Sequence, residues 1–395
     1  MPIFNSLGSN YKFSFVLRAL SADNNDEYKI RLKKLLEQKY EGKAFLVYKG
    51  REALRLALRA SNLKGATVAV CGFTCFAVYD AVVKEGFVPE YLDIEKDELN
   101  FLLTTFKKHL DKNSQIKILI IQNTLGYPCE MEAIAKFCKD KKIILIEDLA
   151  HSIGTVYDNK REAGTVGDMV ALSFSQDKMI DGISGGALII RDSKFSLPDT
   201  SLPFIDQQRQ IVDRLYPLFT FLIRKMYPIG VGKLIHAFLK TFKLLSNPMS
   251  DSGKIHALPA WYCSLVYSEF INLEKNLSHR KKIAALYSAK LDQKFMSEKI
   301  VKQIYLSTDI RFPIFTDDRE KLIKYLKNNN IFVSDIWYDA PIAPRKFLNK
   351  TNYNNDCPES EKISEKILNL PTHKNVSEAD AENIINKINQ WLTIS

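Results

Sequence analysis

Short apolar runs rich in β-branched residues recur between residues 45 and 190, and amphipathic stretches separate them. The runs are almost continuously apolar, as strands must be when both faces of their sheet are covered. The stretches 52–61 and 131–140 suit the helices that connect such strands. This pattern predicts an α/β fold with a mainly parallel sheet and with ligand loops at the strand ends. The predicted strands are 45–48, 67–70, 117–121, 143–147, 169–174 and 186–190.

The alternation of apolar runs and amphipathic stretches then ends, and a basic, apolar helical insert is expected over about 205–250. Pro217 and Pro228 are expected to divide this insert into short helices. Residues 211–246 carry six Lys or Arg against one acidic residue, Asp213. Such a composition is typical of helices that pack on the protein body, and also of a segment that lies against an anionic membrane surface.

The last third of the chain has a different pattern. Leucine and isoleucine recur near helical spacing between residues 262 and 291, which predicts one long linking helix. A strand, a helix and a second strand are expected next, followed by a last helix with Ser377 at its N-cap and Asp380 three residues later. We therefore expect a large domain over 1–255, which includes the insert, and a smaller α+β domain over 256–395.

The composition is that of an ordinary folded protein, because 46% of the 395 residues are apolar and 26% are charged. The net charge of +10 favours an anionic partner. No reading motif or basic patch interleaved with aromatic residues is present, so no nucleic-acid partner is expected. The six cysteines form no CxxC pair or Cys/His cluster, which predicts reduced thiols and no metal site.

No signal peptide precedes the predicted sheet, and no apolar run reaches the length that spans a bilayer. The expected location is therefore cytoplasmic, with a peripheral position at the inner face of the membrane if residues 211–246 bind lipid.

Two residues near the strand ends suggest chemistry. Asp148 lies where a buried strand opens into a loop, and a carboxylate there needs a positive partner. Lys178 lies in a loop that leads into Gly185 and Gly186, and a lysine held there could form a Schiff base with a carbonyl cofactor. Taken singly, each residue is equally consistent with a surface lysine or an acid paired with an arginine.

Taken together, the spacing of these residues resembles the DegT/DnrJ/EryC1/StrS family of pyridoxal-phosphate-dependent sugar aminotransferases. The family pattern is E-D-x-A-[QH]-x-x-G, then S-F-x-x-x-K, then G-G. The resemblance covers roughly residues 40–190 and 256–392, and it implies fold type I, with a large mainly parallel-sheet cofactor domain and a smaller α+β domain. The matching residues are Glu147, Asp148, Ala150, His151, Gly154, Ser173, Phe174, Lys178, Gly185 and Gly186.

The resemblance implies a role for each matching side chain around pyridoxal 5'-phosphate. Lys178 would hold the cofactor as a Schiff base and then move a proton. Asp148 would keep the pyridine nitrogen protonated. His151 would contact the phenolic oxygen, and Ser173 would bind the phosphate.

The chain departs from the family at four places, one of which is Ile183-Ser184 before Gly185-Gly186, where family members commonly have G-E-G-G. Where family members have a short motif that contains a hydroxyl residue, this chain has Gly50-Arg51. The backbone of Gly50 and the positive charge of Arg51 are therefore expected to bind the phosphate group of the cofactor. Cys75 replaces the aromatic residue that stacks on the ring, and Phe76 or Phe73 is the expected substitute. Many family members lend an asparagine to the phosphate site of the neighbouring subunit, but this chain has none near Ile255, and His256 is the candidate replacement.

The implied activity moves an amino group from glutamate to a keto group of a nucleotide-linked sugar, in polysaccharide biosynthesis and in a homodimer with shared active sites. Family members that dehydrate sugars carry histidine in place of the lysine, so Lys178 argues against that branch. Trp337, Tyr338 and His373 match positions that face the family's cleft. One alternative is a non-catalytic protein that retains the fold. Another is an enzyme with the same cofactor that acts on a small amino acid, whose carboxylate would bind Arg311, Arg319 or Arg345.

Overall fold

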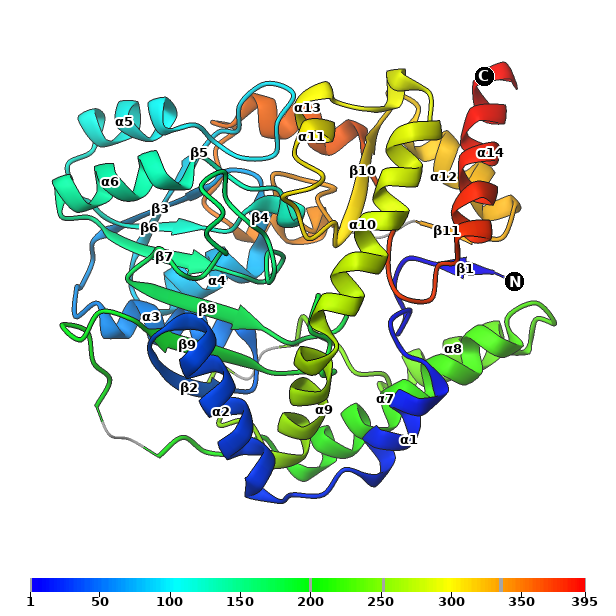
Figure 1. Ribbon diagram of the computed structural model, residues 1–395, viewed down its shortest axis with the longest axis horizontal. Helices are drawn as coiled ribbons and strands as arrows, with labels where there is room; N and C mark the ends of the chain where they lie inside the picture. The colour runs from blue at the N-terminus through cyan, green and yellow to red at the C-terminus, as the bar shows by residue number, and fades with distance from the viewer. Residues whose placement is uncertain (1, 199–200, 251–252, 334–336, 395) are drawn as a thin grey trace.

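A seven-stranded sheet forms the centre of the computed structural model, which describes residues 2–198, 201–250, 253–333 and 337–394 (Figure 1). Its order is β2-β9-β8-β7-β6-β3-β5, and β9 runs in the direction opposite to that of the other six strands. All six predicted strands are present in this sheet. The strands are β2 (Lys43–Val47), β3 (Thr67–Cys71), β5 (Val88–Leu92), β6 (Ile116–Ile121), β7 (Ile144–Asp148), β8 (Met169–Ser173) and β9 (Gly186–Ile190).

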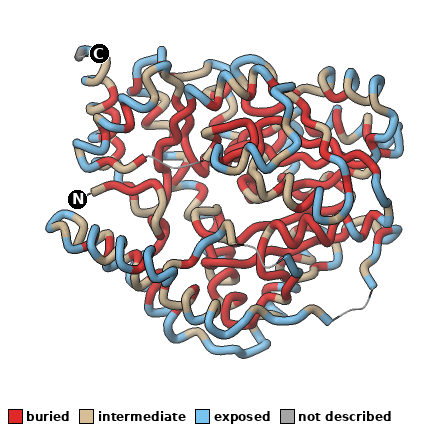
Figure 2. The backbone as a smooth tube through the Cα atoms, turned by 180° about the vertical axis from the view of Figure 1, so that it is seen from behind, coloured by how far each residue is buried: buried red, intermediate tan, exposed pale blue. Residues whose placement is uncertain are grey.

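Helices cover both faces of this sheet. Neighbouring residues of one strand belong to different cores, as Ile118 and Leu119 of β6 show. Figure 2 shows the buried backbone concentrated along the sheet. The helices of this part are α2 (Asp26–Tyr40), α3 (Gly50–Ala60), α4 (Phe76–Lys84), α5 (Leu103–Lys112) and α6 (Met131–Lys141).

The C-terminal part is built around a small antiparallel pair of strands, β10 (Arg311–Phe315) and β13 (Ile367–Pro371). The predicted helix 262–291 is wrong at one point, because it divides at Asn272 into α9 (Ala260–Ile271) and α10 (Leu273–Lys290). Asn272 leaves helical geometry at ψ 9°, and its side-chain amide donates to the carbonyl of Ser268. The other α-helices and strands of this part are α11 (Glu298–Lys302), α12 (Arg319–Asn328), β11 (Ile331–Phe332), β12 (Ile342–Ala343), α13 (Pro358–Lys366) and α14 (Glu378–Ile394).

Two reciprocal hydrogen bonds confirm the predicted start of the last helix. The backbone N–H of Asp380 donates to Ser377 Oγ at 3.1 Å, and the N–H of Ser377 donates to the Asp380 carboxylate at 2.9 Å. Two short strands connect distant parts of the chain, because β1 (Ile3–Phe4) pairs with β11 and β4 (Thr74–Cys75) pairs with β12. The domain boundary at residue 255 stays a prediction.

The insert forms a pair of helices, α7 (Gln207–Met226) and α8 (Val231–Thr241) (Figure 1). The expected break at Pro228 is correct, since it lies between the two helices. The expected break at Pro217 is wrong, because this residue lies inside α7 and is buried. Packing of the α7 face that contains Pro217 offsets the loss of one helical hydrogen bond.

The two helices of the insert differ in how they meet the body. From α7, the buried Asp213 carboxylate accepts hydrogen bonds from Tyr48 at 2.5 Å and Tyr262 at 2.8 Å. Arg224 of α7 also points inward and donates to the carbonyl of Tyr11 at 2.9 Å. Helix α8 instead exposes a row of apolar side chains, which are Val231, Leu234, Phe238 and, just beyond its end, Phe242. Helix α1 (Phe13–Ser21) packs beside α7.

Across the described parts of the chain, none of the helices combines the length and the apolar character that crossing a membrane requires.

Candidate active site

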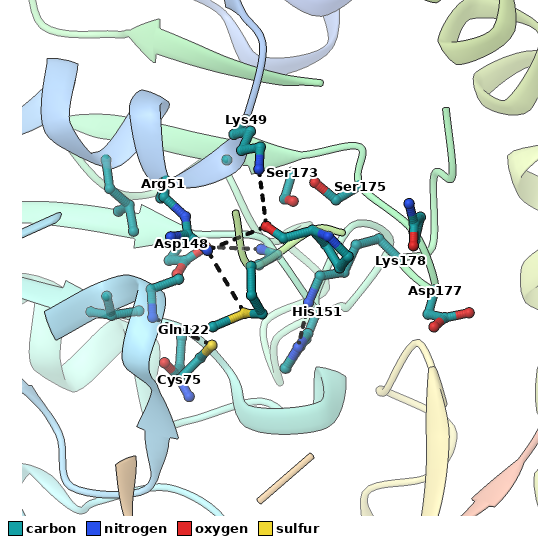
Figure 3. Close-up of a pocket in the computed structure, with 18 of the residues that line it drawn as sticks. Lys49, Arg51, Cys75, Gln122, Asp148, His151, Ser173, Ser175, Asp177 and Lys178 are labelled. Atoms are coloured by element: carbon teal, nitrogen blue, oxygen red, sulfur yellow. Dashed lines mark hydrogen bonds between the residues drawn. The ribbon is translucent and has the colours of Figure 1, made fainter. Parts of the chain in front are cut away.

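A cavity lies at the carboxyl edge of the sheet, where β7, β8 and the start of α3 meet (Figure 3). Asp148 is the last residue of β7, Ser173 is the last residue of β8, and Gly50 is the first residue of α3. The carboxyl ends of parallel strands share one edge, so the topology brings these three residues together. The other polar residues that line the cavity are Lys49, Arg51, Gln122, His151, Ser175, Gln176, Asp177, Lys178 and Tyr338.

Two glycines allow the backbone segments of this edge to approach one another. A Cβ on Gly50 would lie 2.5 Å from the Cβ of Ser173, and a Cβ on Gly186 would lie 2.7 Å from the carbonyl carbon of Lys49. Any larger residue would therefore push α3 away from β8 and β9. The close approach keeps the first turn of α3, with its positive dipole end, beside the Ser173 hydroxyl.

Asp148 is a buried carboxylate at the floor of the cavity, with 6% of its surface exposed. Its Oδ1 accepts a hydrogen bond from the N–H of Ala150 at 2.9 Å. Burial raises the pKa of Asp148 to about 6, although the Ala150 N–H and the nearby Lys178 act against that shift. The carboxylate is thus held in a place where a positive partner would be bound strongly.

Lys178 and His151 form the central contact of the site. The Lys178 Nζ lies 2.9 Å from His151 Nε2, and His151 Nδ1 lies 3.0 Å from the Tyr338 hydroxyl. Burial lowers the pKa of both Lys178 and His151, and the positive charge of Lys178 lowers the His151 pKa further. The imidazole is therefore neutral, and its Nε2 can share a hydrogen bond with the lysine amine.

Trp337 covers this pair. Its ring stacks on His151 with centroids 4.9 Å apart, and Lys178 Nζ lies 4.5 Å from the Trp337 centroid. The guanidinium of Arg311 lies 5.0 Å from the same ring. The indole fixes the imidazole plane and supplies a cation–π contact to the lysine.

The loop that carries Lys178 is held by a residue that sequence reasoning missed. The buried Asp181 carboxylate accepts hydrogen bonds from the N–H groups of Asp177 at 2.9 Å and Ile183 at 3.1 Å. It also accepts from Tyr11 at 2.7 Å and Asn10 at 3.1 Å, so the N-terminal segment fastens this loop. Only the fold brings residues 10 and 11 to this loop, so the motif gave no signal for Asp181.

Six of the predicted site residues line the cavity together, but Phe76 does not. Phe76 packs against Phe347, with ring centroids 4.9 Å apart, and Phe73 is fully buried against Tyr338. The structure therefore differs from the prediction that one of these rings faces the cofactor. Cys75 is the N-cap of α4 and lines the cavity instead. The six residues are Gly50, Arg51, Asp148, His151, Ser173 and Lys178.

Two of the predicted histidines lie elsewhere. His256 Nδ1 is 3.2 Å from a carboxylate oxygen of Glu52, and His373 Nε2 is 2.8 Å from the Phe4 carbonyl. Neither of them lines the cavity of its own chain, and the expected role of His256 at a neighbouring subunit's site stays a prediction.

The three arginines considered as carboxylate anchors also lie outside the cavity lining. Arg319 donates to the Ile367 carbonyl at 2.6 Å, and Arg345 donates to the Asp339 carbonyl at 3.0 Å. Arg311 is buried and contacts the ring of Trp337.

Comparison with known proteins agrees with this geometry. The model of the DegT/DnrJ/EryC1/StrS aminotransferase family matches residues 20–201 and 240–389. GDP-perosamine synthase of Vibrio cholerae is 24% identical over 375 residues, which span 93% of this chain and 90% of that protein. The dTDP-4-amino-4,6-dideoxy-D-glucose transaminase of Shigella dysenteriae is 24% identical over 86% of this chain and 83% of its own length.

Among solved structures, a Helicobacter pylori aminotransferase of pseudoaminic acid biosynthesis superposes with a TM-score of 0.74 at 16% identity and covers 100% of both chains. This likeness shows the fold, which is the α/β fold type I predicted from the sequence. The family match is interrupted over residues 202–239, which contain α7 and most of α8.

Proposed function

The chain belongs to the DegT/DnrJ/EryC1/StrS aminotransferase family, and from that premise we propose that it moves an amino group from glutamate to a keto group of a nucleotide-linked sugar. The cofactor would be pyridoxal 5'-phosphate, attached covalently to Lys178. The observation that carries the proposal is the meeting of Lys178, Asp148 and His151 in one cavity beside the first turn of α3.

The residues of the cavity fit this cofactor. Bound pyridoxal phosphate supplies an aldehyde that accepts an amino group and a ring that stabilises negative charge on the neighbouring carbon. Burial lowers the pKa of Lys178, which enlarges the fraction of neutral, nucleophilic amine. Asp148 offers a buried carboxylate for a protonated ring nitrogen, and Ser173 offers a hydroxyl beside the helix N-terminus.

Each side chain then has a task that follows from its surroundings. Lys178 Nζ carries a proton to and from the substrate carbon, and the neutral His151 ring, whose Nε2 lies 2.9 Å from that amine, orients it and would contact the phenolic oxygen of the cofactor. Asp148 holds a proton on the ring nitrogen because its buried charge has to be neutralised. Trp337 and Tyr338 hold the His151 ring in place and keep water away from the lysine.

The substrates are proposed from relatives and from charge. The Shigella relative is named as a transaminase of a dTDP-linked sugar. A nucleotide-linked sugar and glutamate are both anionic, and the chain has a net charge of +10. We also propose that the chain forms a homodimer and that it is located in the cytoplasm.

Of the two alternatives, a non-catalytic protein would not require the buried Lys178–His151 contact. An enzyme for a small amino acid would need a carboxylate anchor, and none of Arg311, Arg319 and Arg345 lines the cavity.

The covalent attachment can be tested directly. We expect purified protein that is loaded with pyridoxal phosphate, reduced with borohydride and digested to carry the label on the peptide with Lys178. Lys178→Ala should abolish both labelling and amino transfer, whereas Lys64→Ala, which removes an exposed lysine, should change neither. Glutamate should shift the absorbance of the loaded protein and release 2-oxoglutarate. A label on another lysine, or a Lys178→Ala variant that keeps transaminase activity, would contradict the proposal.

A peripheral contact with an anionic membrane is a separate proposal. It rests on the exposed apolar row of α8 and on four exposed lysines of the insert, which are Lys225, Lys233, Lys240 and Lys243.

A further inference from the structure

Two cationic side chains flank Gly50 at the start of α3. Lys49 is 5% exposed and Arg51 is 7% exposed, and both line the cavity (Figure 3). Gly50 itself lies against Ser173, since a Cβ there would be 2.8 Å from the Ser173 Oγ. One end of the cavity therefore gathers two buried cations, a hydroxyl and a helix N-terminus.

The hydrogen-bond partners of these cations belong mainly to the loop that returns from the insert. Lys49 Nζ donates to the Pro248 carbonyl at 3.2 Å, to the Ser250 carbonyl and to Ser250 Oγ at 3.3 Å. Arg51 Nη2 donates to the Pro248 carbonyl at 3.4 Å. These acceptors carry no net charge, and a buried ammonium with only neutral acceptors is costly.

Among the residues that the structure describes, the acidic groups nearby are already engaged with other groups. Asp80 lies 3.7 Å from Arg51 Nη1, but it also pairs with Lys84 at 2.9 Å. Glu52 hydrogen bonds to His256, and Asp213 pairs with Arg209 at 3.3 Å. This end of the cavity is therefore suited to a further negative charge.

We propose that Lys49 and Arg51 form a two-cation subsite for a phosphate monoester dianion, completed by the Ser173 hydroxyl and the first turn of α3. The inference rests on the proposed function, because the phosphate is that of the cofactor. Charged donors bind phosphate oxygens about twice as strongly as neutral donors do. Lys49 is thus a phosphate ligand in addition to the residues that the family motif indicates.

A purely structural role is the competing explanation. In that case, Lys49 and Arg51 would only fasten the loop Pro248–Ser250 to α3 through the carbonyl contacts. The two explanations predict different affinities. If Lys49 and Arg51 only hold the loop, substituting them should change the affinity for an aldehyde equally, with or without a phosphate group.

Protonation gives a second distinguishing property. Burial and the positive charges of Arg51 and Arg209 lower the pKa of Lys49 to about 7, against the opposite effects of Asp213 and Glu52. Within the described part of the chain, the other titratable groups beside Lys49 are Tyr48, Asp206 and His256. A bound phosphate dianion favours the ammonium form, so its binding takes up a proton at Lys49. The affinity gained from the phosphate therefore falls as the pH rises above 7.

The experiment compares pyridoxal phosphate with pyridoxal, which has the same aldehyde and ring but no phosphate. Dissociation constants for both are measured by absorbance titration of the cofactor-free full chain, and the ratio of the two constants removes effects that both aldehydes share. We expect Lys49→Met to weaken the binding of pyridoxal phosphate at least tenfold and the binding of pyridoxal less than twofold. Lys49→Arg should restore the preference for the phosphate, and the exposed control Lys64→Met should leave both constants unchanged.

The pH series sharpens the same test. In the wild type, the preference for pyridoxal phosphate over pyridoxal should decline between pH 7 and 9, and in Lys49→Arg it should stay level because arginine remains charged. Equal changes in both constants, or no change in either, would overturn the subsite, even if Lys49→Met made the loop 248–250 more sensitive to protease.

A failure of the proposed function would look different. Wild-type protein would then bind neither aldehyde at Lys178. Inorganic phosphate alone would decide the subsite in that case, since it should raise the unfolding temperature of the wild type and not that of Lys49→Met. Equal protection of both proteins, or of neither, would overturn the inference.

Discussion

The carboxyl edge of the sheet and the α7–α8 insert differ in how far their charged and apolar side chains are buried. At the sheet edge, Lys49, Asp148 and Lys178 are enclosed, and burial shifts the pKa of each. On α8, lysines are exposed together with Phe238 and Leu234, whose exposed fractions are 58% and 72%. Helix α7 lies between these extremes, since Asp213 anchors its inner face to Tyr48 and Tyr262.

The difference shows where the chain keeps an arrangement that lowers its stability but is needed for activity. A buried carboxylate with a raised pKa destabilises the folded chain, so Asp148 is expected to be worth more to activity than to stability. Exposed phenylalanines cost the fold little, but they leave a surface that water covers poorly. Substitutions in the two regions should therefore separate activity, stability and surface binding.

Asp148→Asn gives the largest expected effect. We expect amino transfer to fall by at least 100-fold, because a neutral amide does not hold a proton on the ring nitrogen. We expect the cofactor-free protein to become more stable at pH 8, by about 2–3 kcal/mol. The folded pKa of about 6 lies above the ordinary 3.8, so the ionised carboxylate weakens the fold increasingly as the pH rises from 4 to 6 and fully above that.

Urea unfolding at pH 8 and at pH 4, together with single-turnover kinetics, checks both parts of this prediction. The stability difference between Asp148→Asn and the wild type should vanish near pH 4. The exposed control Asp158→Asn should leave rate and stability unchanged. A variant that keeps its rate within tenfold would show that Asp148 has no role at the ring nitrogen.

Asp213→Asn tests the anchor of the insert and should affect stability more than chemistry. The amide cannot satisfy the ion pair with Arg209 at 3.3 Å, and it competes for the hydroxyl groups of Tyr48 and Tyr262. Breaking a buried network of this kind costs about 2–4 kcal/mol. We expect a lower unfolding midpoint in urea and faster proteolysis between α7 and α8, with labelling of Lys178 retained. Loss of labelling at unchanged stability would instead place Asp213 in the chemistry.

The comparison also shows which parts of the structure can be predicted from the sequence. Five of the six predicted strands, all but the edge strand β2, lie inside the sheet, and they were predictable because strands buried on both faces are continuously apolar. Strand β5 was missed because it is an edge strand that contains Pro89 and Glu90, which a central position would exclude. The break at Asn272 and the continuity of α7 through Pro217 depend on tertiary packing, which local propensity does not describe.

The same distinction applies within the site. Asp148, His151 and Lys178 came from one motif, and the shared edge of the sheet brings them together. Lys49 was missed although it adjoins Gly50, because its burial depends on the carbonyl groups of a loop some 200 residues later in the chain. The direction of Phe76 depends on where α4 begins, and the sequence indicates a helix start only to within a few residues.

Substitutions on the exposed face of α8 are expected to have the smallest effect on the stability of the fold, and they test directly whether that face binds a partner surface. We expect the triple variant Leu234→Gln, Phe238→Gln, Phe242→Gln to change the free energy of unfolding by less than about 0.5 kcal/mol per substitution, because all three side chains are exposed by more than half. A surface replacement elsewhere, Ile30→Gln on α2, removes an apolar side chain that is 67% exposed and is the matched control.

If α8 contacts an anionic membrane, the wild type should float with anionic vesicles at low salt, and the triple variant should not. Replacing Lys225, Lys233, Lys240 and Lys243 by Gln should also reduce flotation, because headgroup attraction contributes about 1 kcal/mol per lysine near the surface. Arg224 has to be kept, since it holds α7 to the Tyr11 carbonyl and its loss would disturb the fold. Absence of wild-type flotation would show the membrane proposal to be wrong, and flotation that survives both sets of substitutions would place the contact on another surface.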